Sequence, residues 1–145
     1  MVNRRRDEAY ALALCDEIIG TPSLREARFD WLLGDPGKNG TRRRLPVDAY
    51  WPHLGLVIEF WEYQHHVPTP FFDKPDRLTV SGVPRSVQRS LYDQRRQDLI
   101  PQHGLKFLVI RKADLTVNQR GRLTYDRLGD LARIRNMIAE ILPGI

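Results

Sequence analysis

The sequence is short of the residues that build disulfide-linked or membrane-embedded proteins. It has one cysteine among 145 residues, so no disulfide can form within the chain. We expect Cys15 to be a small buried hydrophobic residue, because Leu12 and Ile18 nearby lie on an apolar helix face. No apolar run approaches the length of a membrane span, and the segment after Met1, VNRRRDE, is unlike a signal peptide. These absences predict a single cytoplasmic domain over residues 1–145, with no membrane partner.

Acidic residues are outnumbered, since 18 Asp and Glu stand against 23 Lys and Arg, for a net charge of +5. Such an excess favours a polyanionic partner through counterion release, although it is also common on solvated surfaces. For Arg95 and Arg96 a solvated helix face is about as good an explanation as a phosphate contact. Arginine binds phosphate with two parallel hydrogen bonds, so we predict nucleic-acid contacts for several arginines. These are Arg42, Arg43, Arg44, Arg89, Arg95 and Arg96.

Apolar residues at helical spacing predict four helices. They cover residues 4–19, 23–34, 86–102 and 126–142. Gly20 suits a left-handed cap at the end of the first helix. Ser23 and Glu26 have the spacing of a capping box at the start of the second.

Alternating or continuous apolar residues predict strands over 42–51, 56–61 and 105–110. The first two, joined by a turn at 52–55, form a hairpin. Residues 65–84 are rich in proline, and such a long irregular stretch is typically functional, so we expect a substrate or specificity loop over the site.

Asp48 and Glu59 are the most informative residues. Asp48 lies on the polar face of the first predicted strand, and Glu59 interrupts the apolar run LVIEFW of the second. A carboxylate inside an apolar strand is costly to bury without a compensating partner. Mg²⁺ is often held by one or two carboxylates together with water and phosphate oxygens. We therefore predict that Asp48 and Glu59 bind Mg²⁺, for which Mn²⁺ can substitute; Asp48 by itself would be better explained as an ordinary acid at a strand end.

Three further residues could assist the chemistry. Glu26 could orient a water of the metal, and a helix-capping role explains it equally well. Gln64 and His65 follow the second strand and could position or deprotonate an attacking water, which implies phosphodiester hydrolysis. A zinc site at His65 and His66 is disfavoured, because no second Cys or His group stands at zinc-binding spacing.

Together these segments resemble the PD-(D/E)xK (restriction-endonuclease-like) nuclease superfamily, nearest to the very-short-patch-repair-like and DUF559 endonucleases. The resemblance covers about residues 23–111. It implies an α/β fold with a mixed sheet flanked by helices in αβββαβ-like order, with an extra helix at each terminus. It also implies a metal-dependent DNA endonuclease of repair or restriction. The matching residues are Glu26, Asp48, Glu59, Gln64, His65, Asp93, Arg96 and Gly104.

Trp61 departs from the family pattern, because the signature usually has a lysine two residues after the glutamate. Gln64 or His65 could prepare the water instead. The alternative is a catalytically impaired nucleic-acid-binding module on the same fold, and a basic protein that binds other proteins is a third hypothesis. A homodimer would allow cleavage of both DNA strands, whereas a monomer would more naturally nick one.

Overall fold

The computed structural model describes residues 4–62 and 78–144. Within these residues the chain forms three α-helices, four strands and two short 3-10 helices. In chain order they are α1 (Arg4–Ile19), β1 (Leu24–Leu33), β2 (Arg44–Trp51), η1 (Pro52–Leu54), β3 (Leu56–Trp61), α2 (Arg85–Gln102), β4 (Lys106–Arg111), η2 (Lys112–Asp114) and α3 (Arg127–Ile141).

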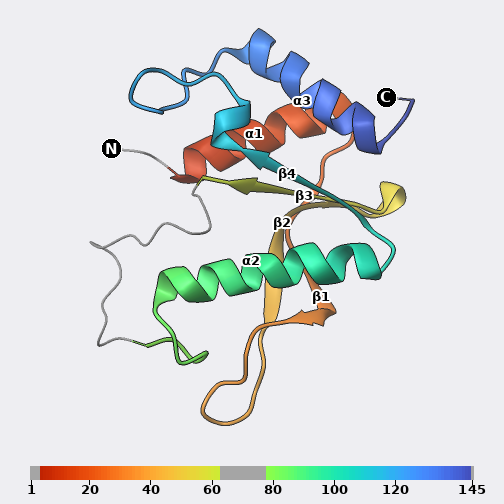
Figure 1. The fold of residues 1–145 in the computed structure, drawn as a ribbon. Coiled ribbons are helices and arrows are strands. Elements are labelled where there is room, and N and C mark those ends of the chain that lie inside the picture. The colour runs from red at the N-terminus through yellow and green to blue at the C-terminus, as the bar shows by residue number, and fades with distance from the viewer. Residues whose placement is uncertain (1–3, 63–77, 145) are drawn as a thin grey trace.

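The described strands form one mixed sheet in the order β1-β2-β3-β4. β2 runs antiparallel to both β1 and β3, whereas β4 runs parallel to β3 and is reached through α2. Figure 1 shows α1 and α3 on one side of the sheet and α2 on the other. The protein is therefore an α/β fold with a mixed sheet flanked by helices.

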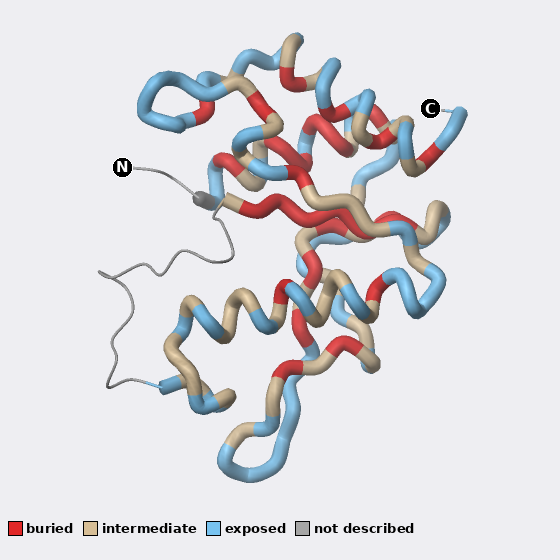
Figure 2. Tube along the Cα trace, in the orientation of Figure 1, coloured by how far each residue is buried: buried red, intermediate tan, exposed pale blue. Residues whose placement is uncertain are grey.

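β3 is buried along its whole length, as a central strand covered on both faces must be (Figure 2). Ile58 and Phe60 point into the apolar cluster beneath α1 and α3, and Val57 points into a smaller cluster beneath α2. Cys15 is fully buried in the larger cluster, as predicted, and burial raises the pKa of its thiol to about 12.

β2 changes sides partway along its length. Leu45 and Val47 belong to the cluster beneath α2, whereas Ala49 and Trp51 belong to the cluster beneath α1 and α3. The change occurs at Asp48, so the first half of β2 leans with β1 toward α2 and leaves the plane of β3 and β4 (Figure 1). The candidate site lies at this point.

The helix predicted over residues 23–34 is wrong, because this segment is strand β1. Its aromatic residues recur at a spacing of two: Phe29 and Trp31 stack with ring centroids 4.7 Å apart. Aromatic side chains favour strands, and Phe29 also contacts Tyr50 of β2, so pairing between strands outweighs the capping-box spacing. The main-chain N–H of Ser23 donates to Asp16.

The change at β1 also alters the element order that was predicted. The helix α1 now directly precedes three strands, so the observed order is αβββαβα. α1 is therefore the helix that opens the αβββαβ-like order, where it was expected to be an extra N-terminal element.

The other predicted elements are confirmed to within one or two residues at their ends. α1 ends at Gly20 with φ +84°, as a left-handed cap requires. Asp126 caps α3 by accepting a hydrogen bond from the main-chain N–H of Gly129. Of the predicted loop over 65–84, residues 65–77 lie outside the described part of the chain. No helix within residues 4–62 and 78–144 is both long enough and apolar enough to span a membrane.

Candidate functional site

Asp48 and Glu59 face each other where β2 and β3 separate. The regular pairing of these strands ends at Ala49 opposite Ile58. One residue further, hydrogen bonds to side chains replace the main-chain bonds between the two strands. The N–H of Asp48 donates to Glu59 Oε2 at 2.5 Å, and the N–H of Phe60 donates to Asp48 Oδ2 at 2.8 Å. The two carboxyl groups predicted from the sequence are thus brought together.

Burial makes both carboxyl groups hard to ionise. Glu59 is only 3% exposed, and burial raises its pKa, which the neighbouring charge of Asp48 raises further. Burial is also the main cause of the raised pKa of Asp48, followed by the charge of Glu8. A pair of adjacent acids with raised pKa values, one buried and one half-buried, is typical of functional sites, because it is unfavourable without a cation.

Glu8 of α1 is a site residue that the sequence interpretation missed. Its carboxyl group hydrogen-bonds to Asp48, which places a third acid at the pair. The preceding residue, Asp7, is engaged elsewhere: it accepts a hydrogen bond of 2.5 Å from the hydroxyl of Tyr125 and lies 3.6 Å from Lys112 Nζ. Had residues 24–33 been interpreted as a strand, α1 would have been the helix to search for the third acid.

Glu26, predicted as that third acid, lies on β1 and not on a helix. Its φ of +54° is left-handed, and its side chain is exposed. In the register it falls between the pairs Arg25–Ala49 and Ala27–Val47, across from Asp48. The helical placement from which its assisting role was predicted is therefore wrong, and it is the carboxyl group of Glu8 that bonds to Asp48.

Arg96 of α2 holds β2 in place where it separates from β3. Its Nε and one terminal nitrogen donate to the carbonyl oxygen of Pro46, at 3.1 and 3.0 Å, so it holds the departing half of β2. Its other terminal nitrogen pairs with Asp93 at 2.8 Å, and Nε lies 3.6 Å from Glu59 Oε1. This guanidinium lowers the pKa of Glu59, against the larger effect of burial.

Trp61, two residues after Glu59 on β3, is buried beside the pair. It is 2% exposed, and its indole N–H lies 3.5 Å from Glu59 Oε1. The guanidinium carbon of Arg111 lies over the ring, 5.1 Å from the centroid. The side chain two residues after Glu59 is therefore an aromatic ring covered by a cation.

Most of the arginines predicted to contact phosphate bind other protein groups. Arg42 donates to the carbonyl oxygen of Gly34, and Arg44 pairs with Asp30. Arg95 donates to the carbonyl oxygen of Leu33 and pairs with Asp35 at 2.8 Å. Arg95 therefore ties α2 to the end of β1 and to the β1–β2 connection, and Arg44 ties β2 to β1.

Arg43 and Arg89 complete that set of arginines. Arg43 is exposed, and no hydrogen bond or ion pair of its guanidinium is found within the described residues. Arg89 is half-buried on α2. Nucleic-acid contact by the six arginines stays a prediction, with Arg43 the most available of them.

The remaining two predicted site residues, Gln64 and His65, lie outside the described residues. Their suggested roles in preparing water therefore stay predictions.

The donor set at the pair suits a hard cation. Asp48, Glu59 and Glu8 offer carboxylate oxygens, which Mg²⁺ prefers. Among the described residues, no three His, Cys, Asp or Glu side chains are arranged as a complete metal site. Two carboxylates are nevertheless enough for Mg²⁺, which keeps several waters and takes further oxygens from a substrate.

Comparisons with protein-family models, with curated protein sequences and with solved structures found no match for this chain.

Proposed function

We propose that this protein is a metal-dependent DNA endonuclease of the restriction-endonuclease-like class, in which Asp48 and Glu59 bind Mg²⁺. The observation that carries the proposal is the pair of acids at the separation of β2 and β3: the buried Glu59 accepts from the main-chain N–H of Asp48, and the half-buried Asp48 accepts from the main-chain N–H of Phe60. A structural role would be served by apolar residues at lower cost, because burying like charges side by side is unfavourable. Bound there, Mg²⁺ would polarise the phosphate and lower the pKa of the attacking water.

The neighbouring residues would fix the geometry of this pair. Glu8 would orient a water through the carboxyl group that now bonds to Asp48. Arg96 is a positioning residue, since it ties β2 to α2 through Pro46 and holds a positive charge 3.6 Å from Glu59. Outer contacts of this kind typically change metal affinity or activity 10- to 100-fold.

Support for DNA as substrate comes from charge. The net charge of +5 favours a polyanion, and Arg43, directly before the strand that carries Asp48, offers an exposed guanidinium. Gln64 or His65, which follow β3 in the sequence, are the residues proposed to prepare the water.

The direct test is incubation of supercoiled plasmid with the protein in Mg²⁺, in Mn²⁺ or in a chelator. We expect cleavage that the chelator abolishes and that Asp48→Asn and Glu59→Gln reduce at least about a hundredfold, since even outer-shell changes reach that size. Asp30→Asn is the matched control, because the side chain of Asp30 is 94% exposed on β1. Full cleavage by both site variants would contradict the proposal.

A DNA-binding module without turnover is the second candidate function. It is favoured by Trp61, which fills the position of the usual lysine, and by the internal hydrogen bonds that already satisfy Asp48 and Glu59. It predicts salt-sensitive DNA binding with no cleavage in either metal. Calorimetry separates the two candidates further, because this module would bind Mn²⁺ no more tightly than the Glu59→Gln protein does.

A further inference from the structure

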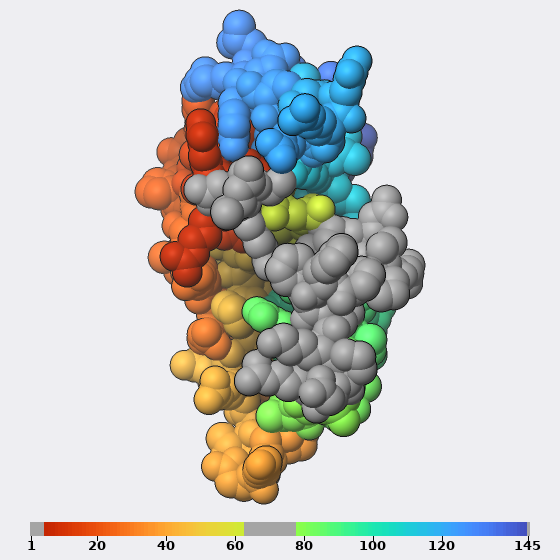
Figure 3. Space-filling view, turned by 90° about the vertical axis from the view of Figure 1, so that its left-hand side faces the viewer, coloured from red at the N-terminus to blue at the C-terminus, as the bar shows by residue number. Residues whose placement is uncertain are grey.

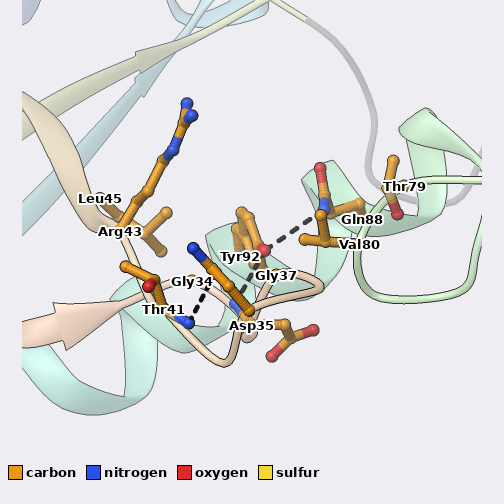
Figure 4. A pocket seen from close by; sticks show the side chains of 11 residues that line it. Gly34, Asp35, Gly37, Thr41, Arg43, Leu45, Thr79, Val80, Gln88 and Tyr92 are labelled. Atoms are coloured by element: carbon orange, nitrogen blue, oxygen red, sulfur yellow. Dashed lines mark hydrogen bonds between the residues drawn. The ribbon is translucent and has the colours of Figure 1, made fainter.

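A second feature of the α2 side is a cavity of about 520 Å³. It lies between the β1–β2 connection, the turn before α2 and the first half of α2 (Figure 4). Figure 3 shows the β1–β2 connection at the opposite end of the molecule from α3. The cavity has the size of the pockets that hold small molecules, commonly 300–1,000 Å³.

The floor of the cavity is built around Tyr92. Its hydroxyl accepts hydrogen bonds from the main-chain N–H of Asp35 at 2.9 Å and from Gln88 Nε2 at 3.2 Å. Gly34 packs so closely that a Cβ there would lie 2.9 Å from the Tyr92 hydroxyl oxygen. Because Arg95 also ties Asp35 to α2, the floor is fixed before any ligand enters.

The walls combine apolar surface with polar groups that remain available. Leu45 and Val80 give apolar contacts, whereas Thr41 and Arg43 reach the rim (Figure 4). Within residues 4–62 and 78–144, no hydrogen bond of the Thr41 hydroxyl or the Arg43 guanidinium is found. Gln88 donates through Nε2, which leaves its carbonyl oxygen to accept. A few polar groups in an apolar pocket, with one cation at the rim, suit a flat polar ring that carries an anionic group.

We propose that this cavity binds a nucleotide, with the base inside and the phosphate against Arg43. Leu45 in the cavity wall and Asp48 are three residues apart on β2, about 10 Å at 3.3 Å per residue. That distance corresponds to about three base steps along a DNA strand. Resting on the proposed nuclease function, the cavity would hold a base a few nucleotides from the bond that is cut.

Binding of mononucleotides tests the cavity without depending on cleavage. The ¹⁵N spectrum of the full chain is titrated with each of the four deoxynucleoside monophosphates in chelator, and with inorganic phosphate alone. We expect shifts at Gly34, Thr41 and Gln88 with nucleotides, and much weaker ones with phosphate. Arg43→Gln is expected to weaken nucleotide binding about tenfold, the usual loss for one charge-assisted hydrogen bond. Arg135→Gln, an exposed arginine of α3 across the sheet, is the matched control.

Two outcomes would overturn the inference: no shifts around the cavity, or equal shifts with nucleotides and with phosphate. Loss of binding in Thr41→Phe, which fills the cavity from an exposed loop position, would support it. Nucleotide binding without any plasmid cleavage would support the nucleotide site in the cavity and contradict the proposed nuclease function. Cleavage by a protein that binds no nucleotide would do the reverse.

Discussion

The two faces of the sheet are held by different interactions. Beneath α1 and α3, sixteen of the described residues form one buried apolar cluster. Beneath α2 the buried cluster has five residues, and Arg95 and Arg96 add hydrogen bonds to main-chain carbonyl oxygens of β1 and β2. One face is therefore packed like an ordinary core, whereas the other is joined by directional bonds.

Buried acids behave differently on the two sides as well. On the α1–α3 side, Asp130 is fully buried but accepts hydrogen bonds from the Tyr10 hydroxyl at 2.5 Å and the Thr116 N–H at 2.8 Å. At the separation of β2 and β3, Asp48 and Glu59 also accept hydrogen bonds, but each has another acid as its neighbour. Stability therefore comes mainly from the first side, and the unfavourable grouping that suits a metal lies toward the second.

Two buried isoleucines give the largest expected effects and test this division. Ile134 of α3 and Ile100 of α2 are both fully buried. Replacing either with alanine is expected to lower the free energy of unfolding by about 2–5 kcal/mol. Only Ile100→Ala should also weaken Mn²⁺ binding, because α2 carries Arg96. Urea unfolding measures the loss of stability, and calorimetry of the folded variants measures the loss of Mn²⁺ affinity. Equal losses of Mn²⁺ affinity in the two variants would contradict the proposed difference between the two faces of the sheet.

Arg96→Lys has the next largest expected effect, because it keeps the positive charge but removes the guanidinium group with its several donors. Lysine cannot donate to the carbonyl oxygen of Pro46 and to the carboxylate of Asp93 at the same time. β2 would therefore be held less firmly where it separates from β3. We expect Mn²⁺ affinity to fall about 10- to 100-fold. Arg135→Lys on α3 is the control and should change nothing. A loss of stability with unchanged Mn²⁺ affinity would show that Arg96 stabilises the fold and does not position the metal site.

The sequence was most informative where burial and chemistry conflict. Glu59 stands out inside LVIEFW, and the polar face of β2 points to Asp48, so the pair could be predicted from two strands alone. Residues 24–33 were wrongly predicted as a helix because the spacing of their apolar residues fits a helix almost as well as a strand. Only the pairing of this segment with β2 decides between the two. That error concealed Glu8. The bend of β2 and the cavity depend on long-range contacts of α2, which no local pattern records.

The pH dependence of stability gives a smaller expected effect. In the metal-free protein, burial and the charge of Asp48 raise the pKa of Glu59 above its unfolded value, about 4.3. The folded state therefore binds more protons, so stability is full below that value and falls as pH rises through the raised pKa values. Urea unfolding at pH 5 and pH 8 in chelator should differ by roughly 1–2 kcal/mol from this cause. Glu59→Gln should flatten the profile, and a wild-type profile as flat as that of the variant would contradict the raised pKa.

Glu8→Gln gives the smallest expected change and decides whether α1 belongs to the site. The amide keeps a hydrogen-bonding group beside Asp48 but removes the charge that helps to raise the pKa of Asp48. If Glu8 only orients water, Mn²⁺ affinity should fall severalfold, toward the low end of the range for outer contacts. Glu17→Gln is the control, because Glu17 also lies on α1 but pairs with Arg127 at the surface. Identical Mn²⁺ titrations of the two variants would show that α1 has only a structural role on the apolar side of the sheet. A loss of Mn²⁺ affinity confined to Glu8→Gln would show that α1 also contributes to the site at Asp48.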